Sequence, residues 1–548
     1  MTEPQNPQPA GAPVPQDPFA ALNGRVLDPA TAVRMADGSA PSSTSYRAHV
    51  LLLTSDSLDQ ARELAGRVVA AAAALGLRPL ADPLTEIRDT EGDPRAQQHN
   101  RLARLLALAD VLGLPLVFPI EFAPVDSGPA PAVDVWPLVQ QLRAAGETGV
   151  GLDHVMLAAP EVEGNPYSVG NPYSVGNPYS VGNPYSVGNP YSVGNPYSVG
   201  NPYSVGNPYS VGNADGLGSY LRGGSGGHAP VAVLLPRPKV DADAARPHAV
   251  VLDTGAGLHP WFGAADVHRR LTLSNGDAVG LDVNDPAVAD TDPEGVGAVP
   301  DPMTGTLGRC AGHGTFITGV LRQTCPQATV TALRIMDVNG LVAESVLTTA
   351  ILGLAVHLDE KARRIDALVL SCGYYAETGA DLTYTAGLLD LLVALADRGV
   401  TTFVSAGNDC TQRPSYPAAF AIAAPFLDPA RLPLVSVAAL NPNGSIALFS
   451  NDGTWVTGEA PGANLVSTAP VRLDAGWQSD TEFDGFGGRR RGTIDPDDYS
   501  GGFATWSGTS FAAPALAGEF LQRLLDLGLP CEATARRDAV PARSEPGD

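Results

Sequence analysis

The sequence has few positive charges and no long apolar run. Lys239 and Lys361 are its only lysines, and 34 Lys and Arg face 58 Asp and Glu among 548 residues, a formal net charge of -24 at pH 7. Nucleic-acid binding depends on clustered basic residues that release counterions, so no nucleic-acid partner is expected. Because no segment holds 18 consecutive apolar residues, no membrane span and no membrane partner are expected either.

Cysteine is scarce as well. The five cysteines are Cys310, Cys325, Cys372, Cys410 and Cys531. An odd, sparse set is unlike the disulfide framework of a small secreted domain, so reduced thiols are expected. The N-terminus lacks the basic start and apolar run of a secretory signal, which favours a cytoplasmic protein. Cys310 and His313 form a CxxH pair, but no second ligand pair accompanies it, which argues against structural zinc.

The first part of the chain falls into two blocks. Residues 1–44 are rich in Pro, Ala and Ser without periodicity, which predicts disorder. Residues 45–160 alternate short apolar runs with helical apolar spacing, and this pattern predicts a small α/β domain. Its role is open between a prodomain that blocks a cleft, a partner-sensing regulator and a passive spacer. We favour a regulator or substrate recruiter, for which a regulatory partner is expected.

A tandem repeat follows. Between residues 165 and 212 the hexapeptide NPYSVG occurs eight times without variation. Asn, Pro and Gly punctuate turns and leave too little hydrophobic density for a core, so residues 161–228 are interpreted as a flexible linker. The alternative is a hexapeptide β-helix, but Tyr falls where such a coil needs a small inward residue.

Residues 229–530 form the largest predicted domain, and residues 531–548 are predicted to be a disordered tail. The strand candidates are HAVVLD, ATVTALRI, DALVLS, VTTFVSAG and LVSVAAL. Helical spacing is expected at 313–322, 342–358, 382–396 and 511–527. This alternation predicts an α/β fold with a parallel sheet, helices on both faces and an active site at the carboxyl ends of the strands.

Three motifs in this domain carry chemistry. They are VVLDTGAG around Asp253, CAGHGTFITGVL around His313 and WSGTSFAAPALAGEF around Ser510. DTG alone also resembles an aspartic protease motif, but that chemistry needs two copies and only one is convincing. In these motifs and in their order, Asp, His, Ser, the sequence resembles the subtilisin family of serine proteases from about residue 248 to 527. The resemblance implies a subtilisin-like fold, a protein or peptide substrate and no cofactor.

Each residue type suits its expected role. A serine hydroxyl is a weak nucleophile and needs an adjacent base, which His313 can be because an unperturbed imidazole titrates near about 6.5. Asp253 would fix the tautomer of that ring and stabilise the imidazolium. Ser510 precedes a helical pattern, where backbone N–H groups favour an oxyanion. Pro514 is expected in the first turn of this helix, where its missing N–H has no partner.

Further site residues rest on the resemblance. Asn408, at a strand end in TTFVSAGND, falls on the oxyanion asparagine of the family, and Ser510 would supply the second donor. The alternative is an ordinary loop asparagine. In LSCGYY and VSAG, two short segments would form the facing walls of the substrate pocket, with Pro417 near its base. These wall residues are Ser371, Cys372, Gly373, Ser405, Ala406 and Gly407.

Two stretches depart from the family pattern. Residues 277–301 hold seven carboxylates and no Lys or Arg, so calcium binding is an alternative to a solvated acidic loop, which we favour. The stretch 471–502 is a long Gly-rich loop, either at the cleft edge or exposed to cleavage.

The preferred function is a serine endopeptidase that works through an acyl-enzyme. The alternative is a catalytically silent binding or regulatory module with a blocked cleft. No cysteine has the helix-start setting of Ser510, and neither lysine belongs to a motif. A thiol nucleophile and a Ser-Lys mechanism are therefore disfavoured.

Overall fold

The fold is taken from a computed structural model, which describes residues 18–35, 37–87, 93–125, 133–158, 228–234, 236–241, 243–283, 292–295, 305, 307–361, 364–378, 382–528 and 533–541. Its centre is a seven-stranded sheet in which all paired strands run parallel. The strands, in spatial order, are β15 (Gly458–Pro461), β14 (Leu434–Leu440), β13 (Thr401–Ser405), β11 (Ala367–Leu370), β7 (His248–Asp253), β9 (Thr329–Arg334) and β8 (Val267–His268). The predicted parallel α/β sheet is confirmed.

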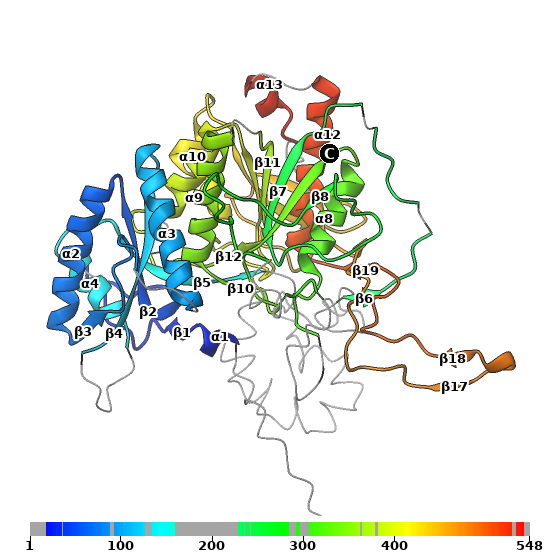
Figure 1. The fold of residues 1–548 in the computed structure, drawn as a ribbon, viewed down its shortest axis with the longest axis horizontal. Helices are drawn as coiled ribbons and strands as arrows, with labels where there is room; N and C mark the ends of the chain where they lie inside the picture. The colour runs from blue at the N-terminus through cyan, green and yellow to red at the C-terminus, as the bar shows by residue number, and fades with distance from the viewer. Residues whose placement is uncertain are drawn as a thin grey trace, which may run out of the picture.

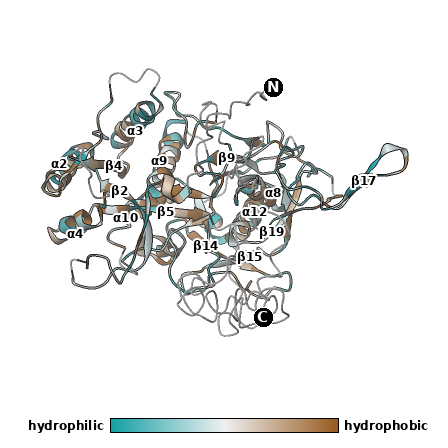
Figure 2. Cartoon of the chain, turned by 90° about the horizontal axis from the view of Figure 1, so that it is seen from below, coloured by the Kyte–Doolittle hydropathy of each residue, from teal (hydrophilic) through white to brown (hydrophobic). Residues whose placement is uncertain are grey.

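Helices cover both faces of this sheet because its strands are apolar on both sides. On β7, Ala249 and Val251 join one buried cluster, and Val250 and Leu252 join the other. The first cluster includes α8 (His313–Thr324) and α12 (Thr509–Leu527), and the second includes α9 (Glu344–Lys361) and α10 (Ala386–Asp397). Figure 2 shows these central helices and strands as predominantly hydrophobic.

The N-terminal domain has an antiparallel sheet in the order β5-β2-β4-β3, with β1 paired to β2. Its strands are β1 (Gly24–Leu27), β2 (Thr44–Ser55), β3 (Leu77–Pro79), β4 (Leu116–Pro124) and β5 (Val150–Ala158). Its helices are α1 (Pro18–Ala21), α2 (Leu58–Ala74), α3 (Pro94–Val111) and α4 (Trp136–Ala144). The predicted helices and strands exist, but alternation of strand and helix does not set strand direction, and the sheet is not of the parallel α/β kind.

The N-terminal domain packs through α9 and α10 against the region that contains the parallel sheet. Helix α9 contacts β4 and β5, and α10 contacts β2 and β4. Buried apolar residues of both parts form one continuous cluster, in which Leu51 and Phe118 of the N-terminal sheet join Leu347 and Leu388 of the two helices. In Figure 1 this domain lies beside α9 and α10, and β5 reaches from it toward β10 and β12.

Two terminal predictions are wrong in part. Within 1–44, Gly24–Leu27 forms β1 through backbone bonds to β2, which a propensity argument does not reveal. Within 531–548, α13 (Ala533–Asp538) is held by Arg536, which donates to Asp366 Oδ1 at 2.9 Å and to the carbonyl of Gly399. Residues 533–538 of the predicted tail are therefore ordered by long-range partners. The repeats and the rest of the predicted linker up to residue 227 lie outside the described residues.

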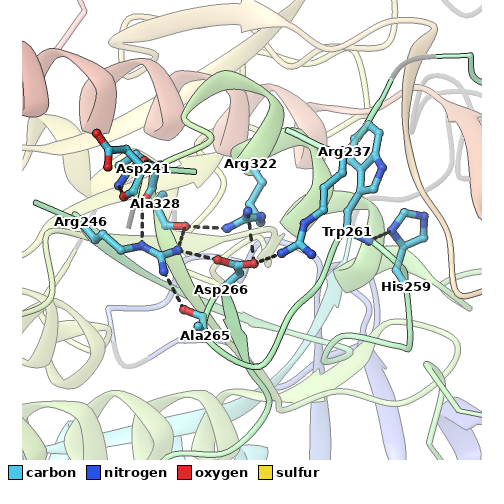
Figure 3. A network of polar contacts seen from close by, with 10 residues as sticks. Arg237, Asp241, Arg246, His259, Trp261, Ala265, Asp266, Arg322 and Ala328 are labelled. Carbon is cyan, nitrogen blue, oxygen red and sulfur yellow. Dashed lines mark hydrogen bonds and ion pairs between the residues drawn. The ribbon is translucent and has the colours of Figure 1, made fainter. Parts of the chain in front are cut away.

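Helix α8 is held in place by a cluster of arginines around Asp266 (Figure 3). Asp266 accepts from Arg246 at 2.9 Å and from Arg237, and Arg322 of α8 lies 3.8 Å from the same carboxylate. Burial alone would raise the pKa of Asp266, but the three guanidinium groups hold it below its usual value. The segment that leads into β7 is thereby fixed to the helix that begins at His313.

The remaining elements are short. They are β10 (Leu341–Ala343), β12 (Cys372–Gly373), η2 (Ala418–Ile422), α11 (Ala424–Leu427), β6 (Ala229–Pro230), β16 (Leu465–Thr468), β17 (Glu482–Asp484), η3 (Phe486–Gly488), β18 (Arg490–Gly492) and β19 (Phe503–Trp506). The stretch 471–502 contains the exposed β17–β18 hairpin, which extends away from the sheet in Figure 1. No helix among the described residues is long and apolar enough to cross a membrane.

Candidate active site

Asp253 is the last residue of β7, at the carboxyl end of the parallel sheet. Its side chain is fully buried. Its Oδ1 accepts from the backbone N–H of Thr254 at 2.8 Å and from the Thr254 hydroxyl at 3.2 Å. These local donors fix the carboxylate at the end of the strand.

His313 begins α8 and meets this carboxylate directly. Nδ1 of His313 lies 2.8 Å from Oδ1 of Asp253, and both side chains are fully buried. A Cβ at Gly314 would fall 2.1 Å from the carbonyl oxygen of Gly255, so glycine permits the close approach of helix and loop. Nε2 of His313 has no hydrogen-bond partner within the described parts of the chain.

Ser510 lies in the first turn of α12, and aromatic residues before and after it contact the His313 ring. The imidazole centroid is 5.5 Å from Trp506 and 5.3 Å from Phe511, residues on either side of Ser510 in the chain. The structure thus brings Asp253, His313 and the Ser510 segment together. Asp253 and His313 are joined by a hydrogen bond, and the Ser510 segment contacts His313 through the rings of Trp506 and Phe511.

Pro514 changes the hydrogen bonding of the Ser510 carbonyl, which the sequence did not predict. Helix α12 begins at Thr509, so Pro514 is inside the helix and not in its first turn, which corrects the prediction. A residue at this position would normally donate its N–H to the carbonyl four residues earlier, that of Ser510. The hydroxyl of Ser371 donates to this carbonyl instead, at 3.0 Å. Proline therefore leaves an acceptor that ties the Ser510 backbone to the Ser371 segment.

Asn408 follows β13 and is oriented by the residue before Ser510. Its Oδ1 accepts from the backbone N–H of Thr509 at 2.9 Å and from the Thr509 hydroxyl at 2.8 Å. The preceding Gly407 has a φ of 107°, and a Cβ there would lie 2.4 Å from Nδ2 of Asn451. With its oxygen anchored on Thr509, the carboxamide has a defined orientation beside the start of α12.

The two expected pocket walls lie beside this site. Ser371 contacts Ser510 as described, and Cys372 and Gly373 form β12. In the other expected wall, Ser405 ends β13, Ala406 follows it, and the N–H of Gly407 donates to the Thr509 hydroxyl at 3.1 Å. Tyr374 and Tyr416 exchange backbone hydrogen bonds, which brings Pro417 and its cis peptide bond next to the β12 wall.

The β12 wall is already paired with a strand of the N-terminal domain. Strand β5 runs antiparallel to both β12 and β10, with Leu157 opposite Gly373 and Ala158 opposite Cys372. Met156 and Ala158 are fully buried, whereas Leu157 is 50% exposed. Strand β5 therefore lies between β10 and β12, with one face turned into the region that contains the parallel sheet.

A buried ionic cluster adjoins this strand. The two ring nitrogens of His154 lie 2.6 Å from Glu344 and 2.9 Å from Glu377, and the ring stacks on Tyr374 with centroids 4.0 Å apart. Burial would lower the pKa of His154, but the two carboxylates raise it to about 9. Burial would likewise raise the pKa of Glu377, but His154 and Arg143 hold it well below its usual range. No sequence motif predicts this cluster, because its partners are far apart in the chain.

Glu294 is a buried residue for which the prediction from sequence is wrong. It was expected in a solvated acidic loop, yet it is 3% exposed, is hydrogen-bonded to the hydroxyls of Thr254 and Thr315, and accepts from the N–H of Gly314 at 3.0 Å. Thr254 follows Asp253, and Gly314 follows His313. Burial raises the pKa of Glu294 to about 8, although these hydrogen bonds act against the rise. The correction follows from tertiary contacts, which composition does not predict.

The pKa of Glu294 leads to a stability prediction. Its raised pKa means that the proton stabilises the folded form below pH about 4.5, and that this stabilisation is lost as pH rises through about 8. Glu294→Gln cannot ionise. From pH 5 to pH 8 we expect the unfolding free energy of the unchanged chain to fall on the order of 3 kcal/mol more than that of Glu294→Gln. Urea unfolding at both pH values, in a Ser510→Ala background to prevent self-digestion, measures this difference. Parallel pH dependence in the two proteins would contradict it.

The other carboxylates of 277–301 that the structure describes include two with arginine partners. Asp277 binds Arg104 of the N-terminal domain at 2.7 Å, and Asp282 binds Arg270 at 2.9 Å. Residues 284–291 and 296–304 lie outside the described part. Elsewhere among the described residues, a cluster of three carboxylates could hold a metal ion. The ligand atoms of Asp474, Asp495 and Asp497 lie within 4.8 Å of one another.

The described cysteines form no disulfide bonds with one another. They are Cys310, Cys325, Cys372 and Cys410, and Cys531 lies outside the described residues. Burial raises the pKa of the Cys372 thiol far above its usual value. A thiol kept neutral in the pocket wall does not suit a nucleophile.

The chain is similar to several known proteins. Minor extracellular protease Epr of Bacillus subtilis (strain 168) is 27% identical to the chain over 167 residues, or 29% of this chain and 22% of that protein, so the match spans about a fifth of the length of this relative. A cold adapted subtilisin-like serine proteinase matches with 20% identity over 54% of this chain and 83% of its own, at a TM-score of 0.33. Fervidolysin from Fervidobacterium pennivorans, a keratinolytic enzyme related to subtilisin, matches with 16% identity over 88% of this chain and 55% of its own, at a TM-score of 0.43.

The family assignment rests on a longer sequence match. The profile of the Subtilase family matches residues 249–523, half of the chain. This segment contains Asp253, His313, Asn408 and Ser510 within the expected motifs. The chain therefore belongs to the subtilase family.

Proposed function

We propose that this protein is a serine endopeptidase with Ser510 as nucleophile, His313 as general base and Asp253 as the residue that orients the base. The observation that carries the proposal is the buried 2.8 Å contact between Nδ1 of His313 and Asp253, beside the start of α12. With Nδ1 facing the carboxylate, Nε2 is the nitrogen left to take the proton of the serine hydroxyl.

The proposed reaction has two halves. Ser510 Oγ attacks the peptide carbonyl as its proton passes to Nε2 of His313, and the tetrahedral intermediate collapses when His313 returns this proton to the departing amine. Water then attacks the acyl-enzyme with His313 again as base, which releases the acid product and restores Ser510. Asp253 holds the imidazole and stabilises its charged form throughout.

Two donors are proposed for the oxyanion. The backbone N–H of Ser510 lies at the N-terminus of α12, where the helix dipole favours negative charge. The anchoring of the Asn408 oxygen on Thr509 supports a role for its NH₂ group as the second donor. Donors held in place before the reaction stabilise the developing charge without reorganisation.

We propose further that the N-terminal domain regulates this activity by filling the cleft. The pairing of β5 with β10 and β12 supports this, because a substrate that adds a strand against β12 would compete with β5 for the same backbone groups. The favoured role of a regulator, with a partner that displaces the domain, remains compatible with this contact. Ser371, Cys372, Gly373, Ser405, Ala406 and Gly407 remain the proposed substrate-binding residues.

The charge state of His154 gives this proposal a pH dependence. Its pKa of about 9, against an ordinary value of 6.5, means that the protonated ring stabilises docking fully below pH about 6.5 and that this contribution is lost as pH rises through about 9. We expect the rate of fluorophosphonate labelling of Ser510 in the unchanged chain, divided by the rate in His154→Gln, to rise on the order of 50-fold from pH 7 to pH 10. The variant corrects for the intrinsic pH dependence of the serine, and a ratio that is constant with pH would contradict the prediction.

The endopeptidase proposal is tested against its alternative with an unfolded protein substrate. The full chain is incubated with reduced, alkylated albumin between pH 7 and pH 10, and new termini are identified by mass spectrometry. The proposal predicts internal cuts. A silent binding module predicts binding without cuts at every pH, and this result, with the protein folded, would refute the proposal.

A further inference from the structure

Strand β5 covers two carboxylates of the region that contains the parallel sheet and the proposed active site, which is called the catalytic region below. Glu344 directly follows β10, and Glu377 lies four residues after β12, so both come from segments that flank β5. Their side chains are 4% and 1% exposed. The hydroxyl of Tyr374 donates to Glu344 at 3.3 Å. Two acids and an aromatic ring thus lie together beside the strands β10 and β12, which flank β5.

The groups that neutralise these acids come from the N-terminal domain. His154, the residue of β5 before the segment paired with β10, lies between the two carboxylates. Arg143 of α4 binds Glu377 at 2.8 Å and stacks over the ring of Tyr384 at 3.7 Å. The catalytic region presents the negative charges, and the N-terminal domain supplies the positive ones.

Departure of the N-terminal domain removes both cations at once. Two carboxylates held close together repel one another, and they bind a cation most strongly where water is partly excluded. The face of Tyr374, on which the His154 ring stacks, is also a favourable surface for a flat cation such as guanidinium. The site that remains is therefore complementary to a positively charged side chain.

A substrate in the place of β5 would present a side chain at this position. In an antiparallel strand with the register of β5, that residue lies three positions before the one opposite Gly373 and two before the one opposite Val342. Met156, on the same face of the strand, is buried, whereas Leu157 is half exposed. Strand alternation directs the residue two positions before Met156 toward the enzyme as well.

We propose that Glu344, Glu377 and Tyr374 form an acidic subsite that recognises an Arg, Lys or protonated His side chain of an extended peptide substrate, on the amino side of the cleaved bond and in the register of His154. This inference rests on the proposed endopeptidase function. It goes beyond that function by defining one chemical class of preferred substrate and the residues that select it.

The test compares peptides on one preparation of the full chain. Internally quenched peptides copy residues 151–159 and continue with Ser-Gly-Ser, with Arg, Gln or Glu at the position of His154. We expect kcat/KM to be about 10-fold higher for the Arg peptide than for the Gln peptide, and lowest for the Glu peptide, because a charge-assisted contact is gained or replaced by repulsion. Since the ratio is taken within one preparation, the fraction of molecules with an occupied cleft cancels.

Matched controls separate this subsite from the general negative charge of the protein. A peptide with Gln at the His154 position and Arg at the exposed Leu157 position should gain less than about 2-fold over the Gln peptide. In Glu377→Gln and in Glu344→Gln, each isosteric with the original, the preference for Arg over Gln should fall to about 3-fold or less. Equal kcat/KM for the Arg and Gln peptides, or an unchanged preference in both variants, would overturn the proposal.

A binding measurement distinguishes failure of the subsite from failure of catalysis. Fluorescence anisotropy of the same peptides with Ser510→Ala protein gives a ratio of apparent Kd values, in which competition by β5 cancels. A ratio of about 10 in favour of Arg, without hydrolysis by the unchanged chain, would retain the subsite and reject the endopeptidase. A ratio near 1, or no binding of either peptide, would reject the subsite even where hydrolysis occurs.

Discussion

Replacement of Ser510 by alanine should lower kcat for peptide hydrolysis by on the order of a million-fold, the size known for the nucleophile of subtilisin itself. The substitution removes the oxygen that would form the acyl-enzyme, while Asp253, His313 and the first turn of α12 remain. The electrostatic stabilisation that these groups still provide should keep the rate of hydrolysis above that of the uncatalysed reaction in water. Initial rates on an internally quenched peptide, at equal concentrations of folded protein, measure the loss.

The control for this experiment is Ser500→Ala. Ser500 is exposed and lies ten residues before Ser510 in the chain. We expect its variant to retain the rate of the unchanged chain within about 2-fold, since exposed positions away from special contacts tolerate substitution. Peptidase activity in Ser510→Ala equal to that of the unchanged chain would show that another residue is the nucleophile.

Asn408→Ala should lower kcat by about 100- to 1000-fold, with a much smaller change in KM. The amide would act on the charge that develops on the carbonyl oxygen in the transition state, so its loss affects the reaction more than substrate binding. Because Asn408 also accepts two hydrogen bonds from Thr509, the circular dichroism and urea unfolding of the variant must be compared with those of the unchanged chain.

Two further variants separate these contributions. Asn443→Ala removes an exposed loop asparagine and should leave kcat within about 2-fold. Asn408→Asp keeps the acceptor for Thr509 but has no NH₂ group, so it should lose at least as much rate as alanine. Full activity in Asn408→Asp would mean that Asn408 serves only to hold Thr509.

Local patterns were sufficient to predict the central sheet. Strands β7, β9, β11, β13 and β14 coincide with the apolar runs identified in the sequence, and α8 and α12 begin within two residues of the expected positions. These elements are buried on both faces, so their composition alone distinguishes them. Strand ends and helix starts then brought Asp253 and His313 together as expected.

Long-range contacts account for what the sequence did not predict. Glu294 lies in an acidic stretch that looks solvated, and its burial becomes evident only from its contacts with Thr254 and Thr315. His154 meets Glu344 and Glu377 across 190 and 223 residues of chain, with no motif at either end. Pairing of β5 with β12 likewise depends on how two domains pack. Such contacts have no local periodicity, so a single sequence does not reveal them.

The assignment of Ser510 as nucleophile and His313 as base is tested most directly with a fluorophosphonate. The experiment identifies the labelled residue and measures how labelling depends on His313. The full chain is labelled at pH 9, digested and mapped by mass spectrometry, together with His313→Ala and Ser510→Ala. We predict one adduct, on Ser510, formed at least about 1000-fold more slowly in His313→Ala and absent in Ser510→Ala. An adduct on a different residue, or labelling of Ser510 at the same rate without His313, would contradict the assignment of this pair as nucleophile and base.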